Sequence, residues 1–256
     1  MKHSRSIGVA AAGLMAVTSA PLVSAAPALT SGGLAQHVRG TTSHNWSGYV
    51  NTDSKTFTFI EANWTEPSYK CDGSSPESAV IWVGLDGFNS STVEQGGTIA
   101  ICNGKNQGTH FAWWEMFPHN SVQEVFPVKV GDKMFASVTY KAGIAKPFNI
   151  FVKDTTSGVS LSMNETCSSG CMRNSAEWIV ETPQFGSQIA FLPKFKPIAL
   201  TGGFSSVGTA QTPLVDIAGF PHQAITMFGA SGNRAVPSAL ASNGQGFTDK
   251  WISSAP

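Results

Sequence analysis

The sequence predicts an all-β protein, built as an antiparallel β-sandwich or barrel. Short runs of β-branched and aromatic residues recur roughly every 8–15 residues, each bounded by Gly, Pro, Asn, Asp or Ser. No segment places apolar residues at i, i+3, i+4 and i+7 over three helical turns. Only 12% of the 256 residues are charged, against roughly 25% in an average soluble domain.

The expected strands follow one another through nearly all of the chain after residue 44. They are Trp46–Val50, Phe57–Trp64, Ala79–Leu85, His110–Phe117, Lys133–Tyr140, Phe148–Lys153, Val159–Met163, Ala176–Glu181, Ile198–Ser205, Leu214–Ile217, Ala224–Phe228 and Gly246–Trp251. Composition does not change after residue 44, and no segment repeats at a fixed period. We therefore expect one domain over residues 45–256.

Alternation within two of these runs predicts how they face the core. Every second residue of the run 133–140, starting at Met134, is apolar or aromatic. This pattern indicates a strand with one buried and one solvated face. In the run 57–64 the apolar parity switches between Phe59 and Ile60, which predicts a β-bulge near these two residues.

The first 25 residues are typical of a secretory signal peptide. Lys2 and Arg5 form a basic start, an apolar run covers residues 7–23, and small residues precede a cleavage site after Ala25. We read residues 26–44, rich in Ala, Ser, Thr and Gly, as a flexible leader or short pro-segment. The expected location is secreted, extracellular.

A transmembrane anchor is the alternative interpretation of the same apolar run. Thr18, Ser19 and Pro21 interrupt it, and no stop-transfer cluster of charges follows. No other segment approaches the roughly 18 apolar residues that a membrane span needs. We therefore expect no membrane association after signal cleavage.

The charge balance disfavours several classes of protein. Sixteen basic residues balance sixteen acidic ones, whereas nucleic-acid binders usually carry a basic excess. Aromatic residues make up 10% and hydrophobic residues 41% of the chain, which is unlike a disordered protein. We expect no nucleic-acid partner.

Four cysteines fit an exported protein with two disulfides. They are Cys71, Cys102, Cys167 and Cys171, and three pairings are possible. We favour the two local pairs, 71 with 102 and 167 with 171. A metal site is the alternative, but no second pair at ligand spacing and no His-x-x-x-His occurs, so we expect neither a metal nor another cofactor.

Several familiar hydrolase motifs are absent, while three acidic residues stand in aromatic or apolar strands. The chain lacks Gly-x-Ser-x-Gly, His-Glu-x-x-His, Asp-Thr-Gly and Asp-Ser-Gly. Asp86 ends a very apolar run, Glu115 lies among four aromatics, and Glu177 precedes a Trp. Strand carboxylates usually face solvent. A carboxylate against aromatic surface, however, has a tunable pKa suited to acid–base chemistry.

Six short strings occur in an order that resembles the glutamic peptidase family, the eqolisins. The strings are Asn45-Trp46-Ser47-Gly48-Tyr49, Asn63-Trp64-Thr65-Glu66-Pro67, Trp82-Val83-Gly84-Leu85-Asp86-Gly87, Glu94-Gln95-Gly96, Trp114-Glu115-Met116-Phe117-Pro118 and Ala176-Glu177-Trp178-Ile179-Val180-Glu181. The resemblance covers roughly residues 44–251. It implies a bent antiparallel β-sandwich of two sheets, like the lectin/glucanase jelly roll.

The same resemblance implies an endopeptidase with a catalytic dyad of Gln95 and Glu177. Trp82 and Asp86 fall on the strand that lines the family's site, and Glu115 matches a carboxylate near its cleft. The family string Trp-Tyr-Glu-Trp-Tyr-Pro is altered here, with Met116 and Phe117 among the replacements. Substrate subsites are therefore expected to differ.

The chemistry of such a dyad follows from the two side chains. An ionised Glu177 takes a proton from the attacking water and later passes it to the leaving amine. Gln95 cannot titrate, but its amide donates to the oxyanion and orients the water. We expect an acid endopeptidase, insensitive to pepstatin and monomeric. Protein or peptide substrates would lie in an extended cleft with aromatic walls from Trp46, Trp82 and Trp114.

A glycan-binding module or a glycoside hydrolase is the alternative function. A bent β-sandwich with aromatics and carboxylates also suits carbohydrate, and a retaining glycosidase needs two carboxylates about 5–5.5 Å apart. Glu177 and Glu181 would lie about 13 Å apart along one strand. Glu115 with Glu177 remains a possible pair. Assays on protein and polysaccharide separate the two functions.

Overall fold

The computed structural model describes residues 38–39, 41–106, 108–119, 122–168, 170–208 and 213–256, and these form β-strands with one 3₁₀ turn at Ile217–Gly219. The predicted signal peptide and most of the predicted leader lie outside these ranges. In the described ranges no helix has the length and apolar character needed to cross a membrane. The expected all-β class is confirmed.

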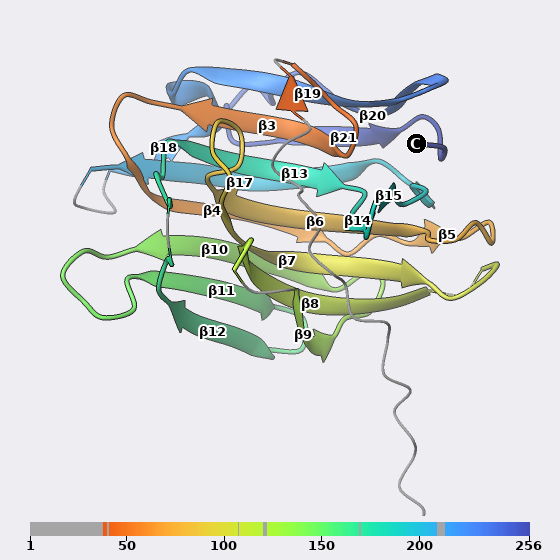
Figure 1. Ribbon diagram of the computed structural model, residues 1–256, viewed down its shortest axis with the longest axis horizontal. Coiled ribbons are helices and arrows are strands. Elements are labelled where there is room, and N and C mark those ends of the chain that lie inside the picture. The colour runs from red at the N-terminus through yellow and green to blue at the C-terminus, as the bar shows by residue number, and fades with distance from the viewer. Residues whose placement is uncertain (1–37, 40, 107, 120–121, 169, 209–212) are drawn as a thin grey trace, which may run out of the picture.

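Two antiparallel sheets pack face to face (Figure 1). The front sheet contains, in spatial order, β19 (His222–Gly229), β3 (Trp46–Thr52), β13 (Ser175–Glu181), β6 (Ser78–Leu85), β7 (Val93–Cys102), β8 (Gly108–Phe117) and β9 (Gln123–Pro127). The back sheet contains β18 (Val215–Asp216), β17 (Ile198–Val207), β4 (Phe57–Thr65), β10 (Lys133–Tyr140), β11 (Phe148–Asp154) and β12 (Ser160–Glu165).

The two sheets are continuous along one side of the molecule. There β20 (Gly232–Pro237) pairs with β19, and β21 (Phe247–Trp251) pairs with both β20 and β17. The predicted sandwich is therefore partly closed. Short strands complete the fold: β1 (Val38–Arg39), β2 (Thr42–Ser43), β5 (Tyr69–Lys70), β14 (Gln184–Phe185), β15 (Gln188–Ile189) and β16 (Lys194–Phe195). Strand β2 pairs in parallel with β19, so the last predicted leader residues join the sheet.

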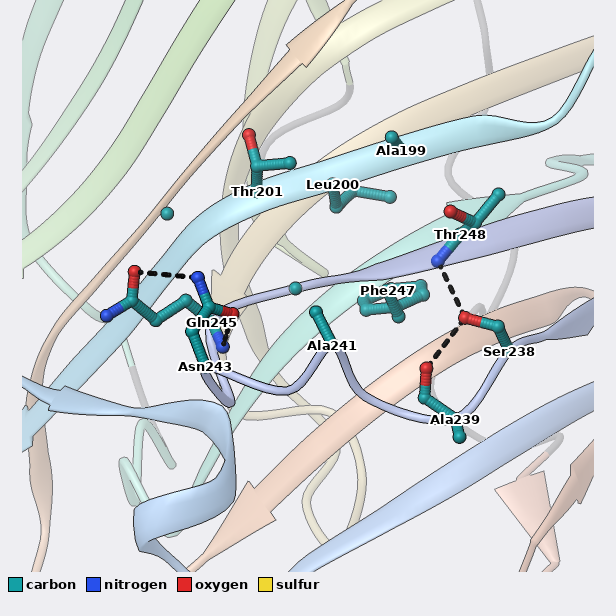
Figure 2. Close-up of a pocket in the computed structure, with 12 residues that line it drawn as sticks. Ala199, Leu200, Thr201, Ser238, Ala239, Ala241, Asn243, Gln245, Phe247 and Thr248 are labelled. Atoms are coloured by element: carbon teal, nitrogen blue, oxygen red, sulfur yellow. Dashed lines mark hydrogen bonds between the residues drawn. The ribbon is translucent and has the colours of Figure 1, made fainter.

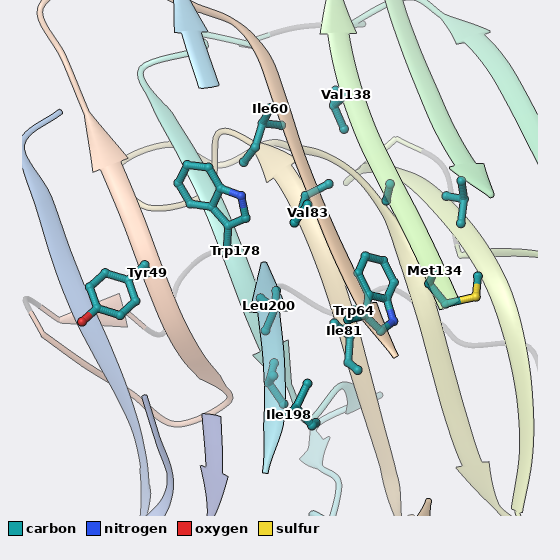
Figure 3. Packing of buried hydrophobic residues seen from close by; sticks show 14 of the residues in the cluster. Tyr49, Ile60, Trp64, Ile81, Val83, Met134, Val138, Trp178, Ile198 and Leu200 are labelled. Carbon is teal, nitrogen blue, oxygen red and sulfur yellow. The ribbon is translucent and has the colours of Figure 1, made fainter. Parts of the chain in front are cut away.

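The space between the sheets is filled by the larger of two apolar clusters (Figure 3). Met134, Ala136 and Val138 are all buried in it, as their shared parity predicts. The Trp178 indole donates to the Glu61 carbonyl at 2.9 Å, which satisfies a buried N–H across the sandwich. This packing makes the front sheet a rigid support for side chains on its other face.

The bulge predicted in β4 near Phe59 and Ile60 is present. Ser206 of β17 is opposite Phe59, but the next residue, Val207, is opposite Phe57. One extra residue, Thr58, is therefore inserted in β4, immediately before Phe59. Phe57 and Ile60 consequently both face the core.

Strand β7 was absent from the predicted strands, because its Glu-Gln-Gly-Gly segment has low β propensity. Its neighbours require those glycines. A Cβ on Gly97 would lie 1.9 Å from the Ile81 carbonyl oxygen, and one on Gly96 would lie 2.6 Å from Ile150 of the back sheet. Close strand packing therefore outweighs propensity here. Strands β9 and β20 were missed as well.

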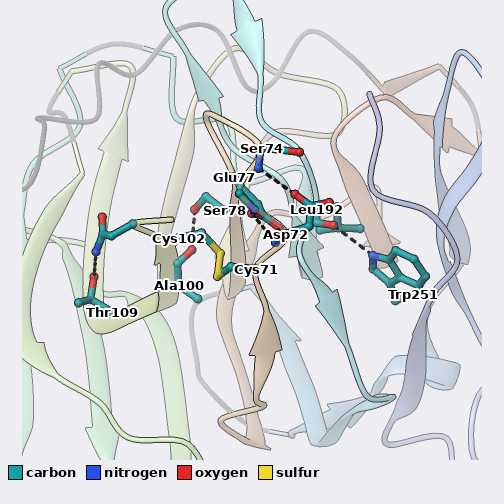
Figure 4. The surroundings of a disulfide bond; sticks show 12 residues. Cys71, Asp72, Ser74, Glu77, Ser78, Ala100, Cys102, Thr109, Leu192 and Trp251 are labelled. Atoms are coloured by element: carbon teal, nitrogen blue, oxygen red, sulfur yellow. Dashed lines mark hydrogen bonds between the residues drawn. A yellow bond between two sulfur atoms is a disulfide. The ribbon is translucent and has the colours of Figure 1, made fainter. Parts of the chain in front are cut away.

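Both favoured disulfides are present. Cys71–Cys102 ties the loop after β5 to the end of β7 (Figure 4), and Cys167–Cys171 closes a tight turn before β13. Near the first bond, the Glu77 carboxylate accepts the backbone N–H of Asp72 at 3.1 Å. Two disulfides are typical of proteins that mature in an oxidising compartment.

Candidate active site

Four residues that belong to four adjacent strands form a row across the front sheet. Glu177 of β13 is opposite Gly84 of β6, Gly84 is opposite Gln95 of β7, and Gln95 is opposite Glu115 of β8. Residues that are directly opposite in an antiparallel pair project from the same face. Pairing therefore brings together the three predicted polar residues, although 82 positions of sequence separate Gln95 from Glu177 (177 − 95).

Gly84 stands between Glu177 and Gln95 and has no side chain, and we call the position above its Cα the gap. Two strand spacings separate these two residues, so their backbones lie about 10 Å apart. Both side chains are long enough to reach a group placed above the glycine. A Cβ on Gly84 would lie 3.2 Å from the Gln95 Cβ and 2.9 Å from Cζ3 of Trp82. The gap is therefore bounded on two sides by side chains that contact the glycine position.

A hydrogen bond orients the Gln95 amide. Its Nε2 donates to Oε2 of Glu115 at 2.8 Å. Burial raises the pKa of Glu115 to about 8, and the hydrogen bond from Gln95 opposes the rise only in part. Among the described residues, Oε1 of Gln95 has no hydrogen-bond partner. The amide is thus held on one side and available on the other.

The Glu177 carboxyl group is fully buried, and neither oxygen has a hydrogen-bond partner in the described part of the chain. Burial raises the pKa of Glu177 well above its usual value, and the charges of Asp86 and Glu94 add to the rise. The nearby Ser175 hydroxyl opposes this pKa shift in part. A desolvated carboxyl group without a fixed partner is well suited to exchange a proton with a bound molecule.

The second apolar cluster surrounds this row on the outer face of the front sheet. Trp82 is opposite Ile179 and Gly97, and Gly97 is opposite Trp113. The rings of Trp46 and Trp82 meet edge to face, with centroids 5.0 Å apart. Trp46 and Trp82 therefore lie on the same face of the front sheet as Glu177 and Gln95.

Trp114 does not lie on that face, which corrects the prediction that it lines the substrate cleft. It belongs to the cluster between the sheets. Side chains alternate along β8, so Trp113 and Glu115 share the dyad's face while Trp114 points into the core. Trp113 and Glu115 are two residues apart, so alternation along the strand already predicts from the sequence that Trp113, and not Trp114, shares the face of Glu115.

Asp86 supports the site from the end of β6. Its backbone is in the left-handed region, with φ at 69°. Its carboxylate accepts the backbone N–H groups of Arg173 at 2.7 Å and Asn174 at 3.0 Å, immediately before β13 begins. Burial raises the pKa of Asp86, while these two backbone hydrogen bonds lower it. Asp86 thus ties the strand that bears Gly84 to the strand that bears Glu177.

Other possible sites in the described residues carry less chemistry. Two groups have metal-ligand spacing, Cys71/Glu77/Cys102 and Glu94/Cys167/Cys171, but their cysteines are disulfide-bonded and offer no thiolate. The pocket in Figure 2 lies between β17 and the loop that precedes β21. No titratable side chain lines it.

The chain matches one protein family in sequence and several solved structures in fold. Residues 44–251 match the family model described as the peptidase A4 family. No curated protein sequence gives a significant match. Scytalido-glutamic peptidase, solved with a peptide-based transition-state analogue, is 20% identical, with a TM-score of 0.68 over 82% of this chain and 98% of that chain.

Two further solved structures show the same fold. SCP-B, described as a member of the eqolisin family in a complex with the tripeptide Ala-Ile-His, is 21% identical, with a TM-score of 0.65 over 82% of this chain and 98% of its own. Aspergilloglutamic peptidase from Aspergillus niger is also 21% identical, with a TM-score of 0.57 over 69% of this chain and 99% of its own.

Proposed function

Because the chain belongs to the peptidase A4 family, we propose that it is a secreted glutamic endopeptidase whose Gln95/Glu177 dyad hydrolyses peptide bonds. The membership confirms the resemblance to the glutamic peptidases and makes the chain a peptide-bond hydrolase. The observation that supports the dyad is the row in which Glu177 and Gln95 face each other across Gly84.

The reaction uses the gap above Gly84 as the place where water and the scissile carbonyl meet. Ionised Glu177 removes a proton from the water as its oxygen attacks the carbonyl carbon. Gln95 donates through its amide N–H to the developing oxyanion, and its carbonyl oxygen orients the water. Protonated Glu177 then delivers the proton to the leaving nitrogen, which restores the carboxylate.

Burial of the site shapes the expected pH dependence. Burial raises the pKa of Glu177, which moves the acid limb of the rate profile to higher pH than an exposed glutamate would give. Glu115, with its pKa raised to about 8, is neutral at lower pH and becomes charged beside Gln95 above that value. A negative charge there disfavours the oxyanion. We expect a maximum below pH 7.

The substrate is proposed to be an extended polypeptide laid over the dyad's face. Trp82 and Trp113 flank the row on this face and supply apolar contact for substrate side chains. Two of the similar structures were solved with a peptide-based inhibitor and with a tripeptide. The two disulfides fit an enzyme that is secreted and acts outside the cell, and we propose that it acts as a monomer.

The geometry gives less support to a glycosidase. Glu115 and Glu177 lie three strand spacings apart, about 14 Å at the backbone, and Oε2 of Glu115 is already bound to Gln95. A retaining pair of carboxyl groups needs a separation of about 5–5.5 Å.

Incubation of the secreted protein with casein and with polysaccharides, at pH 4 to 7 and with pepstatin present, tests the proposal. We expect cleavage of casein alone. Glu177→Gln and Gln95→Ala should each remove it, since loss of one oxyanion donor alone lowers rates about 10²–10³-fold. Glu165→Gln, which alters a carboxylate at the edge of the back sheet, should cleave like the wild type. Polysaccharide cleavage, or full activity of Glu177→Gln, would overturn the proposal.

A further inference from the structure

A second buried carboxyl group lies on the strand of Glu177, and the mechanism above gives it no role. Glu181 is four residues further along β13 on the same face, with 1% of its surface exposed. Both of its oxygens accept hydrogen bonds. The Trp82 indole donates through Nε1 to Oε2 at 2.7 Å, and Asn45 donates through Nδ2 to Oε1 at 3.2 Å. The two bonds fix the carboxyl group in one position.

The Trp82 indole is bound to Glu181 through Nε1, and the opposite edge of the same indole lies beside the dyad. Trp82 precedes Gly84 by two residues on β6, so both lie on one face. A Cβ on Gly84 would lie 2.9 Å from Cζ3 of Trp82, so the six-membered ring leans over the glycine. Trp46 packs against the indole edge to face. The ring is therefore one wall of the gap between Glu177 and Gln95.

We propose that Glu181 is a positioning residue, which holds the Trp82 indole against the gap at Gly84 and so fixes the space where the dyad meets its substrate. Glu181 itself lies about 13 Å along the strand from Glu177, too far to contact the reacting atoms. This inference rests on the proposed peptidase function and assigns to that site a residue to which the sequence analysis gave no role in peptide hydrolysis.

Loss of the Glu181 acceptor leaves the indole N–H of Trp82 buried without a partner. Rotation of the Trp82 ring out of its present position is then favoured. A turned ring moves into the gap or away from it, and in either case the substrate carbonyl is no longer held over the dyad. A misplacement of about 1 Å can reduce turnover by about 10²-fold. Glu181→Gln keeps an oxygen that can accept from the indole, so it should keep the ring in place.

A double-mutant cycle on the full-length secreted protein tests the inference. The variants are Glu181→Ala, Trp82→Phe, their combination and Glu181→Gln, with kcat and KM measured on one peptide and thermal melts run beside them. We expect kcat to fall about 10²-fold in each of the first two. The combination should be no slower than the slower single variant, because both changes break one interaction. Glu181→Gln should restore kcat to within about tenfold of wild type.

Three results would overturn the inference while the proposed function stands. They are wild-type kcat in Glu181→Ala, losses that multiply in the combination, and a Glu181→Gln protein as inactive as Glu177→Gln. If the melts show that Glu181→Ala does not fold, Glu181→Met, which keeps the length of the side chain but lacks the acceptor, takes its place in the cycle. Full activity of Glu177→Gln would refute the proposed function, and this inference with it.

Discussion

Replacement of Asp249 by Asn should make the protein more stable at alkaline pH and leave it nearly unchanged at acidic pH. Asp249 lies on β21, in the part that joins the two sheets, and is fully buried. Neither carboxylate oxygen has a hydrogen-bond partner in the described part of the chain. Burial raises the pKa of Asp249 to about 7, and the Ser47 hydroxyl and the Lys250 amide oppose the rise only in part.

The sign and size of the effect follow from this pKa. The folded protein binds the Asp249 proton more tightly than the unfolded chain, whose Asp pKa is 3.8. The free energy of unfolding therefore falls as pH rises from about 4 to about 7 and is level above that. A shift of about 3 units corresponds to roughly 4 kcal/mol. Asn has a similar shape and no charge at any pH, so it removes this contribution.

Urea unfolding of wild type and Asp249→Asn at pH 4 and pH 8, with disulfides intact, measures the difference directly. Any change in packing caused by the Asn amide is the same at both pH values and cancels. We expect the variant to gain roughly 4 kcal/mol relative to wild type between pH 4 and pH 8. A stability difference that does not change with pH would refute the argument that Asp249 is buried in its neutral form.

Three further predictions concern the site. Gly84→Ala should lower kcat at least about tenfold, because its methyl group displaces Trp82 or Gln95; Gly108→Ala, whose Cβ would have only ordinary contacts at 3.6 Å or more, should match wild-type kcat. Trp113→Ala should change the cleavage sites found by mass spectrometry of digested casein, whereas Trp114→Ala in the core should lower stability by about 3–5 kcal/mol; the reverse outcome would contradict the assigned faces. Glu115→Gln should move the alkaline limb of kcat/KM to higher pH, since it removes a group with a pKa of about 8 beside Gln95; an unmoved limb would count against this cause.

Strand periodicity predicted much of the fold, because burial of alternate residues is a local property of the sequence. Met134, Ala136 and Val138 are buried together as their parity requires. Strand β7 was missed because its glycines are selected by neighbours distant in sequence, such as Ile150 of the back sheet, rather than by local propensity. Likewise, the closure of the sandwich depends on the pairing of β21 with β17, in which Ile198 is opposite Asp249, and no local pattern encodes a pairing between residues so distant in sequence.

The candidate site could be predicted only through resemblance to a family. Nothing local in the sequence indicates that Gln95 and Glu177 are opposite the same glycine, because β6 brings them together from distant parts of the chain. The face of a strand from which a side chain projects, by contrast, can be derived from the alternation of side chains along it. On β8, this alternation places Trp113, and not Trp114, on the face of Glu115. The sequence placed Glu181 on the strand of Glu177, but its bond to Trp82 required the three-dimensional structure.

The rate of cleavage of one defined peptide by Glu177→Gln, relative to wild type at the pH optimum, tests the central claim most directly. Gln has the shape of Glu but cannot take a proton from water, so the fold should persist while turnover is lost. We predict that kcat falls by at least about 10³-fold, with an unchanged thermal melt at acidic pH. A Glu177→Gln protein that is folded and turns over within about tenfold of wild type would contradict the assignment of Glu177 as the general base.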